Sequence, residues 1–180
     1  MVSLSSPRRP LPRRAATALE TNAGLDRPAR GLRALARPLE RVPRVRAMLR
    51  GAPIGHAAHP LLTDAPIGLW LSSTVLDLVG PAEVRAASDR LLGLGILTAV
   101  PTALTGLADW SASGERVQRV GAAHAGLNGL ALGLYTTSWL LRRARRRRLG
   151  VALSLAGGAV LAVSGYLGGH MAFVQRAPQG

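Results

Sequence analysis

The chain has 180 residues and a formal net charge of +14, and 48% of its residues are hydrophobic. All 23 basic residues are arginine, and there is no cysteine. The lack of cysteine excludes disulfides, thiolate metal sites and iron–sulfur ligation by this chain. Because the arginines flank apolar segments, we expect them to contact anionic lipid headgroups, and we expect no nucleic acid partner.

Residues 1–50 form an arginine-rich tail. Residues 1–24 are rich in Ser, Pro, Arg and Ala, a composition typical of disorder. From about residue 29 to 50, apolar residues recur every three or four positions with arginines between them. This pattern predicts an amphipathic segment on a membrane surface, with a solvated linker as the alternative. Pro38 and Pro43 predict that the segment is divided into short helices.

Residues 51–175 contain four apolar segments, each close to the roughly 20 residues that a helix needs to cross a bilayer. We expect Pro60 at the first helical position with His59 outside the helix, and a kink at Pro66. Short connections make consecutive helices antiparallel. The predicted fold is therefore all-α: a four-helix transmembrane bundle with a basic, partly disordered or amphipathic N-terminal tail. The predicted spans are 60–79, 88–108, 120–141 and 149–170.

Small residues recur four apart in the last two segments. They are Gly121, Ala125, Gly129 and Gly133 in the third, and Gly165 and Gly169 in the fourth. Such a ridge lets helix backbones approach closely in lipid, so we predict helix packing here. A flat cofactor lying against a glycine-rich helix would need the same feature.

The antiparallel order brings all four histidines to one membrane face. His56 and His59 lie where the first span begins, His124 where the third begins, and His170 where the fourth ends. Imidazoles from two helices can clamp a b-type haem or bind another metal, and His124 and His170 are the preferred pair of ligands. His59 and His56 are further cofactor-binding candidates, as ligands, as supporting donors or as hydrogen-bond donors to a quinone. Each histidine taken alone also fits a structural role at a helix end.

Several other residues accompany the histidines as supporting candidates: Asp109, Trp110, Asn128, Asp64 and Tyr166. Asp109 could orient a histidine through its second ring nitrogen, or could simply be an acid in the loop after a helix. Asn128 falls on the same helical stripe as His124. Asp77 lies near the opposite face and receives no role in the site.

Familiar catalytic motifs are missing from the sequence. It has no H-E-x-x-H, no G-x-S-x-G and no phosphate-binding loop with a lysine. No catalytic residue is predicted, and we expect a membrane component rather than a stand-alone enzyme.

Four motifs resemble those of the bacterial membrane family called domain of unknown function 2231. They read GHAAHPLLTDAPIGLW at 55–70, LTGLADW at 104–110, AHAGLN at 123–128 and GYLGGH at 165–170. That family often has His-Pro-Leu-His-Pro, whereas Ala57 and Ala58 separate the histidines here. The resemblance covers roughly residues 25–175 and implies a four-span helical membrane protein. Some relatives are fused to Rieske iron–sulfur or cytochrome c domains, which implies a link to electron transfer.

The leading functional hypothesis is a redox component that holds haem b or another histidine-ligated metal and passes electrons to a partner protein or a quinone. The alternative is a non-catalytic membrane anchor or scaffold for a soluble partner, such as an iron–sulfur protein. A proton-coupled transporter is a third hypothesis, and four spans without a repeat would then require a homo-oligomer. We expect a multi-pass protein of the bacterial inner membrane. Because a tail with twelve arginines is hard to export, its N-terminus is expected in the cytoplasm.

Overall fold

The computed structural model describes residues 10–177, and over this range the chain is helical without strands. Three helices precede the apolar region: α1 (Leu11–Thr21), α2 (Asp26–Arg41) and α3 (Pro43–Leu49). Four longer helices follow: α4 (Ala58–Val79), α5 (Arg85–Ser111), α6 (Glu115–Arg143) and α7 (Arg147–Gly169). Short 3-10 turns lie at Ala23–Leu25, Ala52–Ile54 and Ala82–Val84, and a π-helical turn, His170–Val174, ends the described chain. The four long helices cover the four predicted apolar segments.

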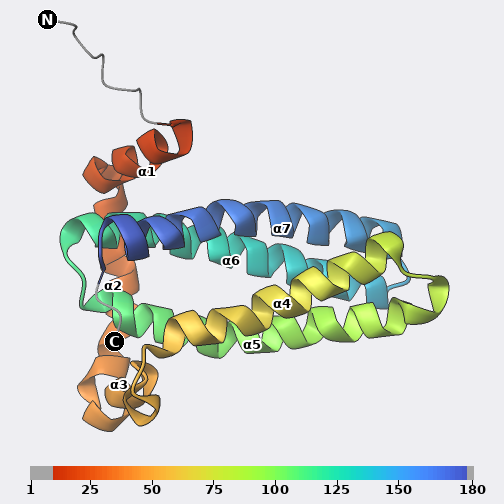
Figure 1. Ribbon diagram of the computed structural model, residues 1–180, viewed down its shortest axis with the longest axis horizontal. Coiled ribbons are helices and arrows are strands. Elements are labelled where there is room, and N and C mark those ends of the chain that lie inside the picture. Colours follow the sequence, from red (N-terminus) through yellow and green to blue (C-terminus); the bar gives the residue numbers. More distant parts are fainter. Residues whose placement is uncertain (1–9, 178–180) are drawn as a thin grey trace, which may run out of the picture.

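The long helices form two antiparallel hairpins, α4–α5 and α6–α7, which lie side by side in an elongated bundle (Figure 1). Helices α1–α3, which we call the cap, cross one end of this bundle. We call that end the motif face, since α4 and α6 begin there and α5 and α7 end there. Two helical segments, Ala82–Ser111 and Arg147–Val174, are long and apolar enough to cross a membrane.

The tail is more ordered than its composition predicts. Where disorder was expected, α1 is a helix, because Ala16 is fully buried and packs with Val120 and Leu167 of the bundle. Residues 1–9, which share that expectation, lie outside the described range. Pro43 begins α3 as a breaker should, but Pro38 lies inside α2. It sits on the exposed side of the last turn, where the carbonyl left without an amide partner can reach solvent.

The start of α4 also differs from the prediction. The helix begins at Ala58, so Pro60 is its third residue and His59 is helical rather than outside the helix. Proline is tolerated there because the first four amides of a helix have no partner within it. Pro66 lies inside α4 and is buried.

An aromatic cluster fills the middle of the bundle. Trp70, Leu92, Ala131 and Tyr135 are buried together, and the rings of Trp70 and Tyr135 stack with centroids 4.1 Å apart. The indole nitrogen of Trp70 donates to the carbonyl of Leu92 at 3.3 Å. Gly95 makes room for the indole, since a Cβ there would lie 2.4 Å from its nitrogen.

A buried ion-pair network joins the four long helices at the end opposite the cap. The side chains of Arg142 in α6 and Asp77 in α4 are 0% and 1% exposed, and Arg142 Nη2 lies 2.5 Å from Asp77 Oδ2. Arg147 of α7 contacts Asp77 Oδ1 at 2.6 Å and Asp89 Oδ1 at 2.8 Å. Arg142 also reaches Asp89 of α5, at 3.1 Å. Two acids and two bases thus form a neutral cluster.

Serines complete the hydrogen bonding of this network. The Arg142 guanidinium donates to the hydroxyls of Ser138 at 3.2 Å, Ser88 at 3.0 Å and Ser154 at 2.9 Å. A buried ion pair is tolerated only when its remaining donors are satisfied in this way. From the sequence, Asp77 received no role in the site, and all the arginines, Arg142 and Arg147 included, were expected to contact lipid headgroups. In the structure both of these arginines bind acids of the bundle.

Replacing Asp77 with Asn should strongly destabilise the bundle, because Arg142 then stays buried with its main counter-charge gone. Breaking one partner of such a pair costs about 3–5 kcal/mol. Unfolding of the purified protein in detergent would measure the loss. The exposed acid Glu83 at the same end provides the control, and Glu83→Gln should change stability by less than about 0.5 kcal/mol. Equal stabilities for the two variants would contradict a structural role for the network.

Candidate functional site

His59 faces α5. Its Nδ1 lies 3.0 Å from the carbonyl oxygen of Thr102, so Nδ1–H donates and Nε2 is the unprotonated nitrogen of the neutral ring. The ring rests against Gly106, where a Cβ would lie 2.7 Å from its Cε1. His59 therefore ties the start of α4 to the end of α5.

His124 faces α7, and both of its ring nitrogens are engaged. Nδ1 lies 2.8 Å from the carbonyl oxygen of Ser164, to which it donates. Nε2 accepts from the Asn128 amide at 3.0 Å. Asn128 in turn accepts from the Ser164 hydroxyl at 2.7 Å. The predicted His124–Asn128 stripe is thus a local network that holds α6 against α7.

His170 is buried beneath the cap. Its Nε2 lies 2.7 Å from Oε1 of Glu20 in α1, and its side chain is 2% exposed. The sequence did not identify Glu20 as a partner. The one available signal was that Glu20 is the sole acid among the first 24 residues.

Asp109 lies near His59 and Arg50. Its Oδ1 is buried, and no hydrogen bond reaches it from residues 10–177. Arg50 donates to the carbonyl of Ala108 at 3.3 Å, while its Nε also lacks a partner in the described part of the chain. The structure therefore places a carboxylate, an imidazole and a guanidinium together at the motif face.

Trp110 closes the turn between α5 and α6. Its indole nitrogen donates to the carbonyl of Gln118 at 3.2 Å, and its ring occupies the space beside Gly121. These contacts give Trp110 a packing role.

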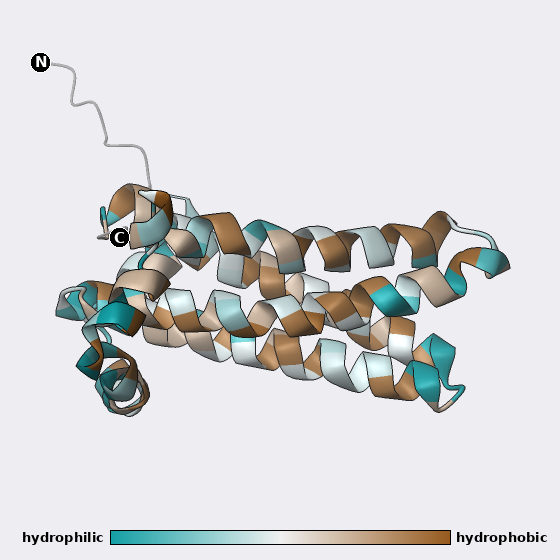
Figure 2. Cartoon of the chain, turned by 90° about the horizontal axis from the view of Figure 1, so that it is seen from below, coloured by the Kyte–Doolittle hydropathy of each residue, from teal (hydrophilic) through white to brown (hydrophobic). Residues whose placement is uncertain are grey.

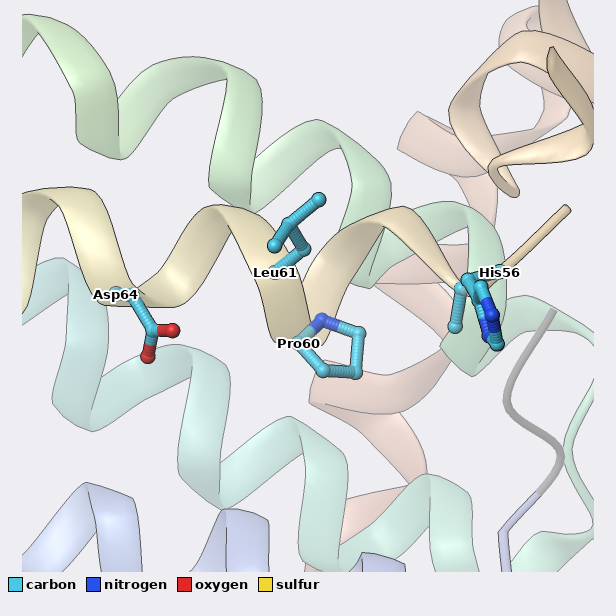
Figure 3. Close-up of a pocket in the computed structure, with 5 residues that line it drawn as sticks. His56, Pro60, Leu61 and Asp64 are labelled. Atoms are coloured by element: carbon cyan, nitrogen blue, oxygen red, sulfur yellow. The ribbon is translucent and has the colours of Figure 1, made fainter. Parts of the chain in front are cut away.

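The remaining candidates lie apart from these groups. His56, Asp64 and Tyr166 are exposed. His56 and Asp64 border an open depression along the start of α4, and Figure 3 shows them at its two ends. The structure thus gives the histidines of the predicted site different partners. His59 bonds to Thr102, His124 to Ser164 and Asn128, and His170 to Glu20.

A metal site was predicted on His124 and His170. Within residues 10–177, no group of three or more histidine and acidic side chains is placed to hold a metal ion. The lone pair of a histidine must be free to ligate a metal, whereas His124 uses both nitrogens and the Nε2 of His170 faces Glu20. These contacts do not favour a haem between the two rings, and that site remains a prediction.

The glycine ridge is packed only in part. Gly121 of the ridge meets Trp110, whereas the glycine that meets the His124 ring is Gly168, which is not part of the ridge. A Cβ at Gly129, Gly133 or Gly165 would have no neighbour within 4 Å among the described residues. Close helix packing, predicted for the whole ridge, is therefore absent at these three positions within the chain.

Polar contacts attach the cap to the motif face. Arg119 Nε lies 2.6 Å from Asp26 Oδ1, and the Ser111 hydroxyl donates to Glu40 at 2.5 Å. The hydrogen bond from Arg119 holds the pKa of Asp26 below its ordinary value of 3.8, and nearby arginine charges act in the same direction.

Replacing Gly106 with Ala should displace the His59 ring and break its bond to Thr102, because the new methyl group overlaps the ring. Gly129→Ala is the matched control, since a Cβ there meets open space and alanine favours a helix by about 0.5–1 kcal/mol. Unfolding in detergent should therefore show a loss for Gly106→Ala and no loss for Gly129→Ala. If both variants gained stability, the close contact of His59 with α5 would be refuted.

Acid should loosen the cap. Since the pKa of Asp26 is lower in the folded protein, its pairing with Arg119 stabilises the fold above the ordinary value of 3.8. That contribution disappears as the pH falls through the lowered value. Hydrogen exchange in α2, corrected for intrinsic rates, should accelerate as the pH falls below 3.8. In Asp26→Asn, α2 should already exchange faster at neutral pH, and this pH-dependent step should shrink.

Comparison with known proteins gives one family. No curated protein and no solved structure matches the chain. A family model described as Predicted membrane protein (DUF2231) matches residues 55–178. The match takes in α4–α7 and all four histidines, while the cap lies before it. Because the match covers more than half of the 180 residues, the chain belongs to this family of predicted membrane proteins, domain of unknown function 2231.

Proposed function

We propose that the chain is a four-span protein of the bacterial inner membrane that acts as a non-catalytic anchor or scaffold for a soluble partner. In this proposal α4–α7 cross the bilayer and the cap lies among the headgroups. The 22 residues of α4, the shortest of the four, extend about 33 Å at 1.5 Å per residue. A bilayer core is about 30 Å thick.

The outer surface of the bundle supports this arrangement. Large apolar side chains are exposed along all four long helices, among them Leu71, Val75, Leu97, Val100, Leu130, Leu155 and Val163. Such a surface suits lipid rather than water. The charges of Asp77 and Arg142 are withdrawn into the ion-pair network, so they do not oppose insertion of α4 and α6.

The cap has the form of an interfacial layer. Ala29 and Ala36 of α2 are buried against the bundle. On a helix of 3.6 residues per turn, Arg30, Arg37 and Arg41 fall within about 40° of one another, and Leu35 lies about 140° round from them. Leu35 is 65% exposed. Separate basic and apolar stripes are typical of helices that lie in a membrane surface.

Exposed apolar side chains continue through the cap to the start of α4, at Val42, Met48 and Ile54. Figure 2 shows brown and teal residues together at this end of the bundle. The cap can therefore contact both acyl chains and headgroups.

The observation that carries the scaffold proposal is the bonding of three histidines. His59 joins α4 to α5, His124 joins α6 to α7, and His170 joins α7 to α1. Each ring makes a hydrogen bond between two helices. This is the pattern expected of histidines that hold a bundle together.

A redox role is the second candidate, and Asp109 favours it. Asp109 has a buried Oδ1 that receives no hydrogen bond from residues 10–177, and beside His59 and Arg50 this carboxylate could exchange protons with a quinone at the membrane face. A haem on His124 and His170 would first require the bonds to Asn128, Ser164 and Glu20 to break.

The scaffold proposal predicts that His124→Ala changes stability and not colour. Protein purified from haem-supplemented cells should be colourless and free of metal. The variant should lose about 1–3 kcal/mol in detergent, because Asn128 and Ser164 then lack their buried partner. Visible spectra, metal analysis and unfolding would test this. A haem spectrum that disappears in His124→Ala or His170→Ala would support the redox role instead.

A further inference from the structure

Asp64 differs from the other aspartates of the long helices, Asp77, Asp89 and Asp109. Asp77 and Asp89 are paired with Arg142 and Arg147, and Asp109 lies near Arg50 and His59. The side chain of Asp64 is exposed on α4, with no hydrogen bond or ion pair from residues 10–177. Its carboxylate therefore has room for a partner from outside the chain.

The position of Asp64 in α4 means that such a partner would stabilise its charge. It lies six residues after Ala58, about 9 Å along α4 from the start of the helix. Given the proposed span, this places the carboxylate below the headgroup layer. A charge that faces lipid at that depth is costly, so charges there pair with other groups.

The surface around Asp64 forms an open depression of about 500 Å³. It is lined by His56, Ala57, Pro60, Leu61 and Asp64, with the two polar side chains at opposite ends (Figure 3). The depression therefore offers an anionic group in the membrane and an imidazole nearer its surface.

A strip of small residues continues from Asp64 towards the middle of α4. Gly68 and Ser72 follow at intervals of four, and both are exposed. A Cβ at Gly68 would have no neighbour within 4 Å among residues 10–177, and the larger Leu71 and Val75 are exposed beside this strip. Small residues along this strip leave space in which an acyl chain can lie against the helix.

We propose that this face of α4 binds a phospholipid whose headgroup carries a primary ammonium. The ammonium donates to Asp64, and an acyl chain lies over Gly68 and Ser72. A choline headgroup has no N–H to donate, and an anionic glycerol headgroup would be repelled by the carboxylate. The inference rests on the proposed membrane span of α4.

The test uses the full chain, reconstituted into nanodiscs that contain a defined mixture of phosphatidylethanolamine, phosphatidylcholine and phosphatidylglycerol. Native mass spectrometry then measures which lipids stay bound. Wild-type protein should retain phosphatidylethanolamine about two- to fivefold above its share of the mixture, the range given by an interfacial ion pair. Asp64→Asn should lower retention to the bulk share. Glu83→Gln, which removes an exposed acid away from the depression, should retain the lipid as the wild type does.

Three outcomes would overturn the lipid site. The first is that Asp64→Asn retains as much phosphatidylethanolamine as the wild type. The second is that the wild type retains phosphatidylcholine as strongly as phosphatidylethanolamine. The third is a dimer that Asp64→Asn dissociates, which would assign this face to a second copy. Alkaline carbonate extraction separates this failure from that of the span. Release by carbonate refutes the membrane span itself, whereas retention in the membrane without lipid selectivity refutes the lipid site alone.

Discussion

The bundle depends on one buried contact, the ion pair between Asp77 and Arg142. A guanidinium with no exposure needs every donor satisfied, and its partners come from α4, α5 and α7 as well as its own helix. A shift of any one helix along its axis would leave a donor or a carboxylate oxygen unpaired. Because breaking such a pair is far more costly than an exposed one, we infer that the network sets the register between the two hairpins.

The opposite end is held differently. There, separate contacts join the hairpins to the cap, among them the polar pairs of His170 with Glu20 and Arg119 with Asp26 and the apolar packing of Ala16. The cap residues come before the part of the chain that matches the family model. The motif face of this protein is thus completed by residues outside the matched region, while the ion-pair network lies wholly inside it.

What the sequence could predict follows from how local each feature is. The long helices could be predicted because unbroken apolar length is a local property of the sequence. The proximity of His124 and Asn128 could be predicted because residues four apart on a helix are neighbours on its surface. Asp77 and Arg142 are 65 positions apart, and Glu20 and His170 are 150 apart, so their pairing depends on packing that no spacing reveals. Helix α1 was missed for the same reason, since Ala16 is ordered by distant Val120 and Leu167.

The hydrogen bonds also shift where a ligand on the motif face would bind. A ligating or proton-accepting histidine needs a nitrogen lone pair that faces the ligand. His124 gives its lone pair to Asn128, and His170 turns towards Glu20. The bond of His59 to Thr102 uses Nδ1 and leaves Nε2 as the acceptor, and what sets His59 apart is its neighbour Asp109, whose Oδ1 receives no hydrogen bond from residues 10–177. Any proton chemistry on this face is therefore better supported at His59 and Asp109 than at the histidine pair that the sequence favours.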